Sequence, residues 1–127
     1  MSQEVKDRDY FTAKRRVPRR KYFEKVGVLV GGRYSVEQAF EIGERGMLIS
    51  SMGDLNEGDR VVVTFHIPEV LFALARGQVR YEIDANSSDN KVNKYGIEFV
   101  DVDFNTRRLI RYYVASKTNL FKETEAD

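Results

Sequence analysis

The chain has 127 residues, of which 42% are hydrophobic, enough for one domain with a real core but too few residues for two. It contains no cysteine, which excludes disulfides, thiolate nucleophiles and zinc–sulfur sites. The net charge is only +1, but residues 14–21 (KRRVPRRK) hold six of the 21 basic residues and no acid. The rest carries 15 basic against 20 acidic residues, so the basic element predicts an anionic partner.

The start of the chain, MSQEVKDRDYF, alternates charges and lacks the apolar segment of a secretory signal. No apolar run approaches the roughly 20 residues that a membrane helix needs. We therefore expect a cytoplasmic protein without membrane insertion.

Residues 1–13 are polar and predict a flexible N-terminal arm. After the basic element, apolar residues alternate over 26–30 and 34–42 on either side of Gly31-Gly32, which is typical of a hairpin. Tyr34 and Val36 are the first two members of the second alternating series. Further glycines precede the short apolar run 47–49, and the composition of 51–59 indicates a turn.

The remaining strands are predicted over 61–67, where Pro68 ends the pattern, over 71–83 with a bend or bulge at Arg76-Gly77, and over 92–102. A polar loop over 84–90 separates the last two. Only the final segment has helical periodicity, and Asp103 or Asn105 can cap its start. The fold prediction is a small six-stranded antiparallel barrel with a C-terminal helix over 14–120, followed by an acidic tail over 121–127.

The inventory of reactive side chains argues against an enzyme. The one histidine, His66, lies in the polar register of a predicted strand, and no serine or aspartate arrangement accompanies it. There is no phosphate-binding GxxxxGK[ST] loop and no calcium-loop spacing. We therefore predict no catalytic residue, no metal and no cofactor.

Arginine supplies four of the six charges in the basic element, at Arg15, Arg16, Arg19 and Arg20. Its planar guanidinium binds phosphates and guanine edges in a bidentate manner that lysine cannot reproduce. Pro18 fixes its own φ and favours an extended conformation at Val17. An arginine arm with a restricted backbone conformation suits a small anion of defined shape better than an extended polyanion.

Arg15-Arg16-Val17-Pro18-Arg19 resembles the RxxxR element that opens PilZ domains. The segment 41–46 (EIGERG) stands where that family carries its [D/N]xSxxG motif, and the apolar strand of that family follows at 47–49. Residues 77–81 and 95–99 resemble two further strands of the family. The resemblance covers roughly residues 14–118.

The resemblance implies a barrel that binds the bacterial second messenger cyclic di-GMP and changes its surface to regulate an unidentified partner protein. In this reading Arg15 and Arg19 take the RxxxR roles, and Arg16 and Arg20 form a second, overlapping pair. A further set of residues completes the expected ligand site: Glu41, Gly43 and Gly46 of the second motif, and Tyr81, whose ring can stack on a guanine or serve only as part of the barrel wall.

Two departures leave alternatives open, because Glu41 replaces the aspartate of the motif and Gly43 replaces its serine. The first alternative is a PilZ-fold adaptor that no longer binds the nucleotide and acts by protein contact. The second is a nucleic-acid-binding barrel, which the sequence favours less because no basic face interleaved with aromatics follows the arm. We therefore expect no DNA or RNA partner.

Overall fold

The computed structural model describes residues 18–52, 55–68, 71–83 and 93–126. The expected arm over 1–13, the first half of the basic element and the predicted loop over 84–90 lie outside these ranges. Within them the chain forms seven strands and one helix: β1 (Arg19–Lys21), β2 (Lys25–Val30), β3 (Arg33–Gly43), β4 (Gly46–Ser50), β5 (Arg60–Ile67), β6 (Leu71–Ile83), β7 (Lys94–Val102) and α2 (Phe104–Ala126).

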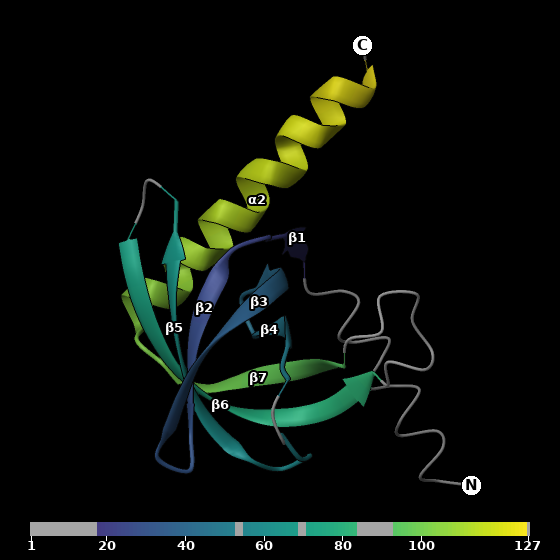
Figure 1. The fold of residues 1–127 in the computed structure, drawn as a ribbon. Coiled ribbons are helices and arrows are strands. Elements are labelled where there is room, and N and C mark those ends of the chain that lie inside the picture. The colour runs from purple at the N-terminus through teal and green to yellow at the C-terminus, as the bar shows by residue number, and fades with distance from the viewer. Residues whose placement is uncertain (1–17, 53–54, 69–70, 84–92, 127) are drawn as a thin grey trace, which may run out of the picture.

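Six of the strands close into an antiparallel barrel in the order β3-β2-β5-β6-β7-β4, with β4 returning to pair with β3. The short strand β1 pairs with the end of β3, beyond the part of β3 that pairs with β2. It therefore prolongs the line of β2 along the same edge. Figure 1 shows the barrel with α2 projecting from one end. The predicted six-stranded barrel with a C-terminal helix is confirmed.

The predicted hairpin is also present, with β2 and β3 joined at Gly31 and Gly32. Both glycines have positive φ, 56° and 80°, a conformation that two-residue hairpin turns require and that side chains disfavour. The bend predicted in residues 71–83 is a shift in the pairing of β6 with β7 between Arg76 and Gly77.

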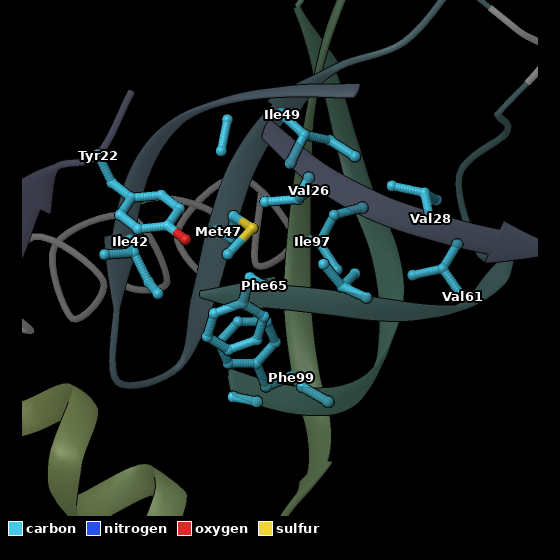
Figure 2. Packing of buried hydrophobic residues seen from close by; sticks show 14 of the residues in the cluster. Tyr22, Val26, Val28, Ile42, Met47, Ile49, Val61, Phe65, Ile97 and Phe99 are labelled. Carbon is cyan, nitrogen blue, oxygen red and sulfur yellow. The ribbon is translucent and has the colours of Figure 1, made fainter. Parts of the chain in front are cut away.

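The core is formed by the inward residues of all six barrel strands (Figure 2). Phe65 of β5 and Phe99 of β7 stack with ring centroids 5.8 Å apart, and branched side chains surround them. Because successive strand residues point to opposite sides, the residues next to these core positions in the sequence face outward.

The apolar alternation in the second strand of the hairpin does not coincide with burial at its start, because Tyr34 and Val36 are exposed. They pair with Leu29 and Gly27 on the outer face, while Val26 and Val28 lie inside. A bulge between Ala39 and Glu41 then reverses the alternation, so Ile42 is fully buried although Val36 is not.

Helix α2 begins directly after Asp103, whose carboxylate accepts the backbone N–H of Thr106 at 3.1 Å. Asp103 is therefore the cap, one of the two residues predicted for that role. Ile110 and Val114 of the helix are buried with the barrel core. The helix continues to Ala126 and so includes most of the segment expected as an acidic tail. None of the helices among the described residues is long and apolar enough to span a membrane.

Candidate functional site

The candidate site begins where β1 brings the second half of the basic element onto β3. Arg19 pairs with Gly43, and Lys21 pairs with Glu41. The guanidinium of Arg19 lies 3.4 Å from a carboxylate oxygen of Glu41, and both side chains are partly exposed. Two motifs that are 22 residues apart in the sequence therefore meet at one place on the barrel wall.

Glu41 also belongs to a row of residues that crosses the outer wall. It pairs with Leu48 of β4, Leu48 pairs with Gly96 of β7, and Gly96 pairs with Tyr81 of β6. Directly opposed residues share one face of a sheet, so all four point to the outside. The Tyr81 ring covers Gly96, where a Cβ atom would collide with it. The ring of Tyr81 therefore lies over the neighbouring strand β7, closer to Glu41 than the Tyr81 backbone on β6 is.

A second row lies beside the first and contains both glycines of the EIGERG motif. Gly43 pairs with Gly46, which pairs with Glu98 of β7. A Cβ atom at Gly46 would collide with the backbone oxygen of Ile97, so close approach of β4 to β7 requires glycine there. At Gly43 a Cβ atom would lie 2.9 Å from the Pro18 oxygen and 3.3 Å from Arg19 Cγ. Gly43 therefore lets the backbone of β1 lie close against β3.

Arg20 lies on the other side of β1 from Arg19. It pairs with the buried Ile42 and faces the helix. Its Nη1 donates to the backbone carbonyl of Tyr113 at 3.1 Å, and its Cζ lies 3.6 Å from the centroid of the Tyr113 ring. This is a cation–π contact combined with a charge-assisted hydrogen bond. The structure thus separates two neighbouring arginines that the sequence grouped in one ligand site.

Tyr22 extends this contact into the core. Its ring meets Tyr113 edge-on at 6.4 Å, and its hydroxyl donates to the carbonyl of His66 at 2.5 Å. Burial, with a smaller contribution from Glu24, raises the pKa of Tyr22 well above its usual range. The phenol therefore remains a donor at any physiological pH, and β1, α2 and β5 are held together beneath the site.

The turn of the EIGERG motif is bound to the same helix. Both carboxylate oxygens of Glu44 accept from Arg111, at 3.1 and 2.8 Å, and the Glu44 carbonyl accepts from Arg107 at 3.5 Å. The hydrogen bond from Arg111 lowers the pKa of Glu44. A motif that the sequence related only to the ligand is therefore also the place where α2 attaches to the barrel.

Two cations that border the two rows were not among the residues expected in the ligand site, although Lys21 belongs to the basic element. Lys21 lies beside Glu41, and Arg80 of β6 forms an ion pair with Glu98 at 2.8 Å. Strand register is the signal that finds them, and it was not available before the barrel was known. Arg15 and Arg16 lie outside the described residues. Among those described, no cluster of three or more potential ligand side chains could hold a metal ion.

Comparison with known proteins matches most of the chain to one family. The family model described as the PilZ domain matches residues 13–116. Among curated proteins, none matches the chain.

Three solved structures share the fold at low sequence identity. The Bacillus subtilis inhibitor of motility, MotI/DgrA, has a TM-score of 0.70 and 14% identity, over 81% of this chain and 51% of that one. The Escherichia coli YcgR PilZ domain with c-di-GMP has a TM-score of 0.64 and 11% identity, over 88% and 97%. The Borreliella burgdorferi PlzA protein in complex with c-di-GMP has a TM-score of 0.58 and 11% identity, over 97% and 57%. The chain thus spans about half the length of the motility inhibitor.

Proposed function

The chain belongs to the PilZ domain family, and on this premise we propose that it is a receptor for cyclic di-GMP that regulates a partner protein. The observation that carries the proposal is the meeting of Arg19 with Glu41 and Gly43 on one patch of outer wall. Two structural relatives were solved with this nucleotide bound, which supports the same ligand class here.

The ligand is a compact dianion with two guanines, each presenting an O6/N7 acceptor pair that arginine binds in a bidentate manner. We assign this task to Arg19 together with Arg15 and Arg16. In this proposal Glu41 releases Arg19 and accepts hydrogen bonds from the donor edge of a guanine. An exposed ion pair contributes at most about 1 kcal/mol, so this exchange costs little. Three or four charge-assisted bonds of about 1.5–3 kcal/mol each support micromolar affinity after ordering costs.

Arg20 has a different part in the proposal. It already donates to the Tyr113 carbonyl and stacks on the Tyr113 ring, contacts that it would lose on turning to a ligand. We infer that Arg20 anchors β1 on α2, so that ordering of the arm by ligand is transmitted to the helix. Gly43 and Gly46 allow the strands of the outer wall to pack closely. Tyr81 provides an aromatic ring at the end of the row that begins at Glu41.

The adaptor reading remains the second candidate. It is favoured by the Arg19–Glu41 ion pair, in which the two expected ligand residues satisfy each other. An adaptor of this kind would keep the barrel and the helix attachment and would dispense with the nucleotide.

Calorimetric titration of the purified chain decides between the two. The receptor proposal predicts saturable, micromolar binding of cyclic di-GMP and no comparable heat from GMP at the same concentrations. Absence of heat with both nucleotides, from a protein that melts cooperatively, would favour the adaptor.

A further inference from the structure

A second surface lies on the opposite half of the barrel sheet, across strands β3, β2, β5 and β6, which are neighbours in that order (Figure 1). Eleven large hydrophobic side chains are exposed in the described part of the chain, and five of them belong to this surface. They are Leu29, Tyr34, Val36, Phe72 and Leu74. We call this surface the apolar wall.

Strand register makes the apolar wall continuous. Val36 pairs with Gly27, Gly27 with Thr64, and Thr64 with Leu74. In the adjacent row Tyr34 pairs with Leu29, Leu29 with Val62, and Val62 with Arg76. Single exposed hydrophobic residues are ordinary, but contiguous apolar patches on soluble domains mark interaction sites. Phe72 is 80% exposed and Tyr34 is 65% exposed, so neither is held there by packing in the core.

The apolar wall is also hollowed. A depression of about 330 Å³ is lined by residues that include Lys25, Gly27, Tyr34, Val36, His66 and Phe72. A side chain at Gly27 would collide with the hydroxyls of Tyr34 and Thr64. The volume is at the lower end of ligand-sized pockets and suits one bulky anchor side chain from a partner.

Lys25 borders the depression, and the charged residues on the rest of the apolar wall have the same sign. The apolar wall is formed by residues 25–29 of β2, 34–38 of β3, 60–66 of β5 and 72–76 of β6, and the outward positions of these segments include three cations and no acid. The cations are Lys25, Arg60 and Arg76, of which Arg76 has an exposed contact of 3.7 Å to Asp101 on the neighbouring strand β7. Outside the basic element the chain carries 15 basic against 20 acidic residues, so a surface without acids differs from the composition of the rest of the chain. An apolar centre with a basic border complements an acidic, apolar segment.

We propose that the apolar wall docks an acidic peptide segment of another protein, which places one aromatic or large aliphatic side chain in the depression beside Gly27. The proposal does not involve Arg19 or Glu41 and does not depend on nucleotide binding. A flat lipid surface has no single side chain to fill a depression, and a nucleic acid does not gain from an apolar centre. A second copy of the chain would bring the same cations against one another.

Selection from a phage-displayed library of random linear peptides, with the full chain as bait, tests this directly. The expected result is enrichment of peptides in which Asp and Glu flank an aromatic or large aliphatic residue. Their affinity, measured by fluorescence polarisation, should fall about tenfold or more with Phe72→Glu and also with the milder Phe72→Ala. Lys25→Glu should weaken binding as well. Phe104→Glu, at a residue 77% exposed outside the apolar wall, should leave it unchanged.

Other outcomes would overturn the proposal. These are enrichment of uncharged or basic peptides, or of peptides that bind Phe72→Glu as well as the original chain. Two further measurements test whether a lipid membrane or a second copy of the chain occupies the apolar wall instead. Co-sedimentation with phosphatidylglycerol vesicles that Phe72→Glu abolishes would show a membrane contact instead. A concentration-dependent dimer that the same substitution dissociates would show a second copy of the chain.

Discussion

Two adjacent arginines in β1 have opposite environments. Arg19 is directed to the outer wall, where it meets Glu41, and Arg20 is directed to α2, where it stacks on Tyr113. The sequence could identify both as members of a basic element but could not separate them. The pairing of β1 with β3 determines which arginine faces the outer wall and which faces the helix. The sequence does not reveal this pairing, because a strand of three residues is too short to show an alternating pattern.

Replacing the two arginines should therefore have different effects on stability. Arg20→Ala removes a cation–π contact and a charge-assisted hydrogen bond and should lower the free energy of unfolding by about 1–2 kcal/mol. Arg19→Ala removes an exposed ion pair and should change it by less than about 1 kcal/mol. Chemical denaturation of both variants measures the difference. Equal loss of stability in the two would show that Arg20 does not anchor the helix.

The two glycines of the EIGERG motif should also differ. Gly46→Ser places Cβ against the backbone of Ile97 and requires β4 and β7 to separate, and overpacking of this kind costs about 1–3 kcal/mol. Gly43→Ser meets the Pro18 oxygen at 2.9 Å, and β1 has few partners to prevent a small adjustment. Thermal melts should rank Gly46→Ser well below Gly43→Ser. The reverse order would contradict the packing described for this wall.

At the scale of elements, periodicity predicted the strands because each barrel strand has one buried face. It predicted the helix because Ile110 and Val114 recur at helical spacing and are buried. It could not show that Tyr34 and Val36 lie on the outer face, because apolar residues on an exposed face alternate just as those in a core do. The rows that join Glu41 to Tyr81 depend on the order and register of four strands, which one sequence does not contain.

The attachment of α2 to the barrel should depend on pH through Glu44. Its pKa is lowered by Arg111, so the ionised form stabilises the folded state above the ordinary glutamate pKa, and this contribution is lost as pH falls through the lowered value. Glu44→Gln should melt below the original chain near neutral pH, and the gap should close below about pH 4. Melting curves across this range provide the test. A gap that persists in acid would mean that the ion pair is not its source.

At the scale of the whole molecule, charge is divided between a basic element and an acidic body. A single basic element on an acidic body suits a small dianion better than a long nucleic acid, and the two ligands can be distinguished by the salt dependence of binding. Neutralising many phosphates makes nucleic-acid affinity fall steeply with salt, whereas two phosphates and two guanine contacts should lose far less over the same range. Fluorescence titrations at low and moderate salt, with cyclic di-GMP and with a random oligonucleotide, should give a shallow slope for the first. Displacement of cyclic di-GMP by the oligonucleotide at moderate salt would contradict the account.

The central claim is that cyclic di-GMP binds where Arg19 meets the second motif. It is tested most directly by calorimetric titration of the original chain beside Arg19→Ala and Arg60→Ala. The two variants lose the same charge, but Arg60 lies on β5, on the apolar wall. The account predicts that Arg19→Ala weakens binding by about 1.5–3 kcal/mol, tenfold or more, while Arg60→Ala binds like the original chain. Equal affinities in all three proteins, or equal losses in the two variants, would show that the ligand does not sit against Arg19.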